Sequence, residues 1–161
     1  MKALEQLAKF CAILAGVLLT AITLSTCLNI IGRETIGRTA AGDFELVGVA
    51  AGAAIALFMP WCQVTKNNII VDFFTAKCSE ATNAKLDRLG AFLMATIFAV
   101  LTWRTTLGGL NSWKTNTTTM MMGFPEWIVY SFMVPAFALT CLIALMQALG
   151  LQNTSTKGNL A

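Results

Sequence analysis

Four long stretches of this sequence contain no charged residue, and this feature constrains the fold more than any other. The stretches are 10–32, 46–65, 89–103 and 127–156. Crossing the hydrocarbon core of a bilayer takes roughly 20 apolar residues. The first, second and fourth stretches are long enough alone, and the third is long enough if it continues through Arg104 to Leu110. Soluble domains carry about 25% charged residues, whereas this chain carries 12%.

The sequence therefore predicts an all-α integral membrane protein, a single domain over residues 1–161 with four transmembrane helices. The expected spans are 10–31, 44–65, 89–110 and 126–150. Between the second and third spans, residues 68–85 combine apolar residues at helical spacing with interspersed charges. This pattern is typical of an amphipathic helix lying at the membrane interface, so membrane lipid is an expected partner. Residues 152–161 are expected to form a C-terminal tail.

The basic residues predict the orientation of the chain. With four spans both termini share a side, and seven of the basic residues fall on that side. They are Lys2, Lys9, Lys66, Lys77, Lys85, Arg88 and Lys157, against Arg33, Arg38, Arg104 and Lys114 on the other side. The positive-inside rule then places both termini in the cytoplasm. The net charge of +3 is thus explained by topology, and no nucleic-acid partner is expected. The first span is too long for a typical signal peptide and is expected to remain.

Residue types that carry chemistry are scarce. There is no histidine, which removes the commonest general base and metal ligand. The five cysteines show no metal-binding or redox spacing. No carboxylate lies within a charge-free stretch, so no proton or cation relay is indicated. We expect no catalytic, metal-binding or cofactor-binding residues, and neither an enzyme nor an autonomous pump.

Small residues recur every four positions in the first two spans. The first span contains Ala12 and Gly16, and the second contains Gly48, Gly52 and Ala56. This spacing lets two helices approach closely, which matters in lipid because packing replaces the hydrophobic effect there. These residues are candidates for a subunit interface. Packing within the four-helix domain explains the pattern equally well.

The prolines and two aromatic residues indicate kinks and anchors. Pro60 falls late in the second span and should kink or end it, because proline removes a backbone hydrogen bond. Pro125 suits the first turn of the fourth helix. Trp127 and Tyr130 then fall at the outer interface, where aromatic rings with one polar group are favoured. Pro135 lies deeper and should bend the last span.

Arg104 is the one charge expected near membrane depth. It lies about 22 Å along the helix from Leu89, at 1.5 Å per residue, which is near the far interface. There a long side chain can snorkel out to water. Pairing with Asp43 or Glu45 is the alternative. The loop 111–122 is polar and then rich in methionine, which favours a contact surface over a binding pocket.

Three motifs, taken in order, resemble the small membrane (Q) subunit of tripartite ATP-independent periplasmic (TRAP) transporters. They are GDFELVGVAAGAAIALFMP at 42–60, NIIVDFF at 68–74 and MGFPEWIVYSFMVPAF at 122–137. The resemblance covers nearly the whole chain, including the four spans and the amphipathic segment. One departure is visible, because many members have a histidine and a basic residue where this chain has Asn68 and Ile70.

The resemblance implies a scaffold protein in the bacterial inner membrane that has no transport site of its own. It would brace a large multi-span subunit that imports an organic acid or related solute with a sodium gradient. A periplasmic substrate-binding protein would deliver the solute, and the basic residues of the periplasmic side could contact it. Those contact candidates are Arg33, Arg38, Arg104 and Lys114.

Two other classes of function stay open from the residues. One is a self-contained homo-oligomeric transporter or channel, which predicts flux through liposomes containing this chain alone. The other is a small membrane enzyme or electron carrier, which predicts a bound quinone or a visible absorption spectrum.

Overall fold

The computed structural model describes residues 2–37, 42–65 and 80–150. This part of the chain contains four helices, each long and apolar enough to cross a membrane. They are α1 (Lys2–Ile36), α2 (Asp43–Val64), α4 (Glu80–Thr115) and α5 (Trp127–Ala148). The predicted fold class, an all-α protein with four transmembrane helices, is confirmed.

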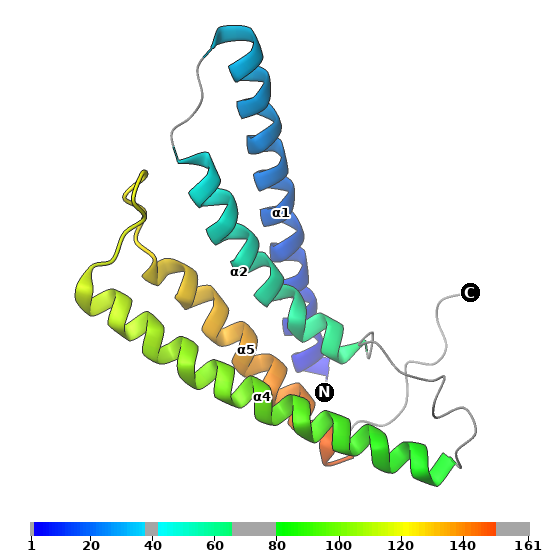
Figure 1. Cartoon of the computed structure of the whole chain (residues 1–161). Helices are drawn as coiled ribbons and strands as arrows, with labels where there is room; N and C mark the ends of the chain where they lie inside the picture. Colours follow the sequence, from blue (N-terminus) through cyan, green and yellow to red (C-terminus); the bar gives the residue numbers. More distant parts are fainter. Residues whose placement is uncertain (1, 38–41, 66–79, 151–161) are drawn as a thin grey trace, which may run out of the picture.

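The helices form an open row in the order α1, α2, α5, α4 (Figure 1). Helix α1 packs on α2, α2 packs on α5, and α5 packs on α4, while α1 makes only slight contact with α5. The two outer helices of the row, α1 and α4, thus have one main neighbour each. Along the helix axes, the start of α1 and the end of α5 lie at the same end, which we call the terminal end. The opposite end, where α4 leads into α5, is called the hairpin end.

The contact between α1 and α2 follows a regular seam. Ala8, Cys11, Ala15, Leu18 and Ile22 recur at alternating intervals of three and four, which keeps them on one side of a helix. Ala8 and Ala15 are fully buried. Because alanine side chains are small, the two helix backbones can approach closely.

Helix α2 lies inside the row, so it packs on both sides. Ala54, Ala56 and Leu57 are buried in a cluster with Ala15 of α1 and Ala136 of α5. On the far side of α5, the ring centroids of Phe98 and Phe137 lie 5.9 Å apart. These contacts link all four helices through small or aromatic side chains.

Two helices are longer than the membrane requires. Helix α1 has 35 residues and α4 has 36, and at about 1.5 Å per residue each exceeds a hydrocarbon core of about 30 Å. Helix α4 begins at Glu80 and its candidate membrane span begins at Lys85, so residues 80–85 of the expected interfacial helix are continuous with α4. The remainder of that expected helix, 68–79, lies outside the described residues.

The prolines occupy three different settings. Helices α2 and α5 both continue through their internal prolines, so Pro60 does not end α2. Pro60 is buried, whereas Pro135 is exposed. Pro125 lies just before α5 rather than in its first turn, because Glu126 is the N-cap residue and Pro125 bridges to Thr118.

Candidate functional site

The loop between α4 and α5 forms a short hairpin over residues 116–126, with methionines at its tip. Two backbone hydrogen bonds close the hairpin. The Thr119 N–H donates to the Phe124 carbonyl at 3.0 Å, and the Gly123 N–H donates to the Thr119 carbonyl at 3.0 Å. The Thr119 hydroxyl also accepts from the Phe124 N–H at 3.0 Å. Met120 is 98% exposed. The expected loop at 111–122 is wrong over 111–115, because these residues continue α4, and the rest of it lies in this hairpin.

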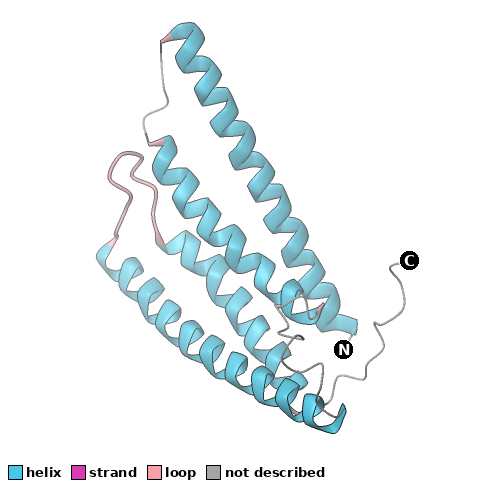
Figure 2. Cartoon of the chain, turned by 45° about the vertical axis from the view of Figure 1, so that its right-hand side comes forward, coloured by secondary structure: helices cyan, strands magenta, loops and turns pink. Residues whose placement is uncertain are grey.

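The hairpin docks on the start of α2, as Figure 2 shows. The Glu45 carboxylate accepts the Met121 N–H through both oxygens, at 3.2 and 3.0 Å. Gly42 allows the close approach, because a Cβ there would overlap the Met122 Cγ. Its φ of 89° also favours glycine. We call this contact the hairpin clasp; it joins the α1–α2 pair to the α4–α5 pair.

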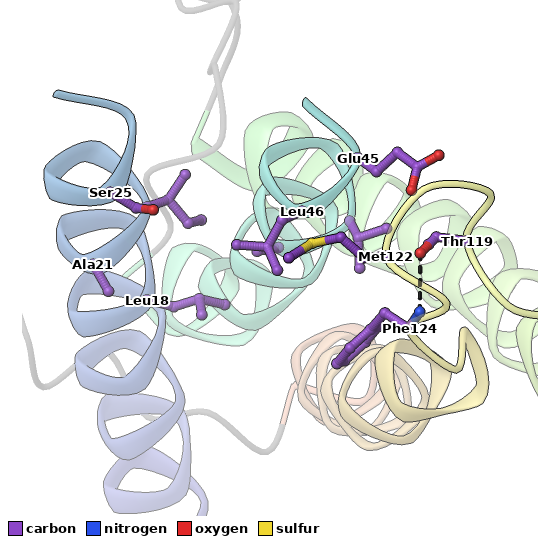
Figure 3. Close-up of a pocket in the computed structure, with 11 residues that line it drawn as sticks. Leu18, Ala21, Ser25, Glu45, Leu46, Thr119, Met122 and Phe124 are labelled. Atoms are coloured by element: carbon purple, nitrogen blue, oxygen red, sulfur yellow. Dashed lines mark hydrogen bonds between the residues drawn. The ribbon is translucent and has the colours of Figure 1, made fainter. Parts of the chain in front are cut away.

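A pocket of about 400 Å³ lies between α1, α2 and the hairpin. Figure 3 shows Leu18 and Ala21 of α1 on one side and Met122 of the hairpin opposite them. The walls are mostly apolar, and Glu45 lies at the edge near the hairpin clasp. Within the described residues no group of histidine, cysteine, aspartate or glutamate is arranged to hold a metal ion.

Breaking the hairpin clasp should loosen the hairpin. A Glu45→Gln variant keeps the shape but loses the charge that strengthens hydrogen bonds from backbone N–H groups. We expect hydrogen–deuterium exchange at Met121 to become severalfold faster. Asp43→Asn is the matched control, because Asp43 makes no hydrogen bond to the hairpin. Equal exchange in wild type and Glu45→Gln would show that the clasp does not hold the hairpin in solution.

At the terminal end, two glutamines join α2 to α5. Gln63 Nε2 donates to Gln147 Oε1 at 2.7 Å, and Gln147 Nε2 donates to the Gln63 backbone carbonyl at 2.8 Å. Gln63 is buried, with 4% of its surface exposed. The sequence gives a signal for this pair, since each glutamine is a strongly polar side chain within an apolar span.

Removing one glutamine should destabilise the α2–α5 contact. Hydrogen bonds between membrane helices contribute about 0.5–2 kcal/mol. We therefore expect Gln147→Ala to lower the unfolding free energy by about that amount, measured by thermal unfolding in mild detergent. The loss of unfolding free energy in the double variant with Gln63→Ala should be smaller than the sum of the losses in the two single variants. Each single variant already removes the Gln63–Gln147 side-chain hydrogen bond. Strict additivity would show that the pair is not coupled.

Glycines in α4 allow α5 to approach closely. A Cβ at Gly109 would lie 2.9 Å from the Tyr130 Cβ, whereas one at Gly108 would lie 3.4 Å from the Tyr130 ring. Next to this contact, Trp113 and Trp127 pack edge to face with ring centroids 4.6 Å apart. The expected membrane anchors Trp127 and Tyr130 therefore also hold α5 to α4. The adjacent glycines Gly108 and Gly109 inside the third expected span could have indicated this close contact from the sequence.

The small-residue candidates fall into two groups. Ala56 is buried inside the chain, while Ala12 and Gly16 are only half-buried beside the α1 seam. A Cβ at Gly16, Gly48 or Gly52 would meet nothing within 4 Å. The three glycines are therefore not needed for packing between the described helices.

The basic candidates lie on different parts of the molecule. Arg33 and Lys114 are in the last turns of α1 and α4, at the hairpin end, and both are exposed. Arg104 is exposed on α4, and the Glu45 carboxylate bonds Met121 rather than Arg104. Arg38 lies outside the described residues.

A comparison with known families gives one match over most of the chain. The family model described as "Tripartite ATP-independent periplasmic transporters, DctQ component" matches residues 22–153. The comparisons with curated proteins and with solved structures gave no match. The matched region includes α2, α4, α5, the hairpin clasp and the glutamine pair.

Proposed function

The chain belongs to the family of DctQ components of tripartite ATP-independent periplasmic transporters, and from this premise we propose that it braces the large membrane subunit. It is the small membrane subunit of such a transporter, a component of the bacterial inner membrane. The large subunit would carry the solute, an organic acid or related compound, with a sodium gradient. This chain would supply a rigid surface against which that subunit moves.

The observation that carries the proposal is the open row of helices. Within an apolar 18-residue window of each helix, only 11% of the α1 residues and 33% of the α2 residues are buried inside the chain. An open row leaves two broad helix faces uncovered, and Gly48 and Gly52 lie on α2 with free space beside them. Lipid does not drive apolar helices together, so glycines that admit a close neighbour support docking of another protein. We assign this face of α2, with Gly16 of α1, to the large subunit.

The contacts within the row support a bracing role. The hairpin clasp joins the two helix pairs at one end, and the Gln63–Gln147 pair joins α2 to α5 at the other. Polar contacts at both ends, with a packed seam between them, oppose rotation of one helix pair against the other. A surface of this kind holds its shape while a neighbouring subunit changes position.

The proposed orientation has both termini in the cytoplasm and the hairpin in the periplasm. The exposed Arg33 and Lys114 then face the compartment of the substrate-binding protein. With Arg104 and Arg38, they are the residues we assign to contact with that protein. Cysteine labelling from outside the cell tests the orientation, because Lys114→Cys should react with a reagent that does not cross the membrane.

The test of the proposed function is a mild-detergent pull-down of the tagged chain from its native membranes. We expect a large multi-span protein to co-purify in equal amount, identified by mass. In liposomes containing this chain alone, we expect no solute flux. Recovery of the chain only with itself, together with flux in those liposomes, would instead establish a homo-oligomeric transporter or channel.

A further inference from the structure

The pocket beside the hairpin clasp has the size and lining of a ligand site. Its volume of about 400 Å³ lies in the range of about 300–1,000 Å³ that is usual for such sites. Its walls come from three separate elements, with Ala21 on α1, Val49 and Ala50 on α2, and Phe124 on the hairpin. Figure 3 shows Leu18 and Ala21 of α1 on one side of the pocket and Leu46 and Met122 on the other. The pocket is partly open to the surface of the chain, so a ligand can enter it from outside.

The depth of the pocket limits what can fill it. Helix α2 begins at Asp43, and Val49 and Ala50 lie about 9–11 Å along it at 1.5 Å per residue. These residues are within the membrane-spanning segment of α2. An apolar cavity at this depth does not hold water. The apolar material available there is a lipid acyl chain.

The shape of the pocket favours a lipid chain over a segment of another protein. A helix with its side chains is about 10–12 Å across, so a single turn of it takes up roughly 500 Å³, which is more than the pocket of about 400 Å³. The hairpin wall is held in place by the Glu45 bonds and by the Gly42–Met122 contact. A single flexible chain can enter between these walls without moving them.

The edge of the pocket carries negative charge. Glu45 lines it, and Asp43 lies in the same first turn of α2. Because the headgroups of the nearer leaflet lie at this level, an ammonium group is favoured there and an anionic headgroup is disfavoured. We propose that this pocket binds one acyl chain of a zwitterionic phospholipid with an amine in its headgroup, such as phosphatidylethanolamine.

The test uses the full chain co-expressed with its large membrane subunit and reconstituted in nanodiscs. The probe is phosphatidylethanolamine with a photoreactive diazirine in one acyl chain, and labelled positions are mapped by mass spectrometry. We expect label to concentrate on 18–25 and 46–50. In Ala50→Phe it should fall by roughly tenfold, because the ring occupies the space of the chain. Val100→Phe is the matched control, since Val100 is an exposed α4 residue outside the pocket, and it should leave the label unchanged.

A second probe tests the headgroup. Phosphatidylglycerol with the same diazirine chain should label the pocket roughly two- to fivefold less, as expected for one exposed charge pair. Label spread evenly over the exposed helix surfaces, or unchanged by Ala50→Phe, would overturn the proposal. So would stronger labelling by phosphatidylglycerol, or loss of label when the large subunit is present. The amount of large subunit that co-purifies is measured in the same samples. Loss of association with the large subunit, on which the bracing role rests, is therefore distinguished from loss of lipid labelling.

Discussion

Leucine in place of Gly109 is expected to separate α5 from α4 and to have the largest effect on the fold of this chain. Even a single Cβ there would lie 2.9 Å from the Tyr130 Cβ, a contact that only a shift of the two backbones can relieve. Overpacking of this kind costs about 1–3 kcal/mol. Because α4 packs mainly on α5 among the described helices, little else in the described part of the chain holds α4 in place. We expect a lower unfolding temperature in mild detergent, together with altered tryptophan fluorescence from the Trp113–Trp127 pair.

The neighbouring glycine provides the control. A Cβ at Gly108 would lie 3.4 Å from the Tyr130 ring, which is ordinary van der Waals contact, and alanine is the better helix former by about 1 kcal/mol. Gly108→Ala should therefore leave stability unchanged or raise it, whereas Gly109→Ala should lower it. If the two alanine variants unfold at the same temperature, the close approach of α5 to Gly109 does not exist in the membrane protein.

Leucine in place of Gly52 is expected to weaken association with the large subunit strongly while the chain itself folds and inserts normally. Within the chain a Cβ at Gly52 would meet nothing within 4 Å, so the substitution introduces no clash among the described residues. A partner helix that approaches the glycine closely would be displaced. We expect roughly tenfold less large subunit in the pull-down, since a clash typically costs about 1–3 kcal/mol and about 1.4 kcal/mol is a tenfold step in affinity. The unfolding temperature of the chain alone should not fall.

The control for Gly52 is the same substitution at another open position. Gly90 of α4 also has free space beside it, so Gly90→Leu should leave the yield of the complex unchanged. A wild-type yield of complex from Gly52→Leu would exclude this face of α2 as the docking surface. The family assignment would remain, and the other uncovered faces of the row would become the candidates.

The number and approximate position of the spans could be predicted because hydrophobicity is a property of each residue. A charge inside the bilayer is costly wherever its neighbours are, so the charge-free stretches alone specify four membrane helices. The small-residue spacing at Gly48 and Gly52 could also be recognised, because it too is a property of one segment of the sequence. The helix that packs against these glycines could not be predicted, because the spacing shows that a helix can approach closely but not which helix does.

Contacts between helices depend on residues that are far apart in the sequence. Ala8, Ala15 and Ile22, rather than the stripe containing Ala12 and Gly16, form the buried seam of α1, and both stripes are apolar and regularly spaced. The two are distinguished only by the shape of α2 opposite them.

The sequence by itself determined that this chain has four segments apolar and long enough to cross a membrane, and the structure forms a helix over each of them. Only the tertiary structure decided that the helices form an open row, that Glu45 holds the hairpin, and that Gly109 admits Tyr130. The physical reason is the solvent. In lipid, burial of apolar surface does not select partners, so the arrangement follows from close packing and a few hydrogen bonds whose members meet only after folding.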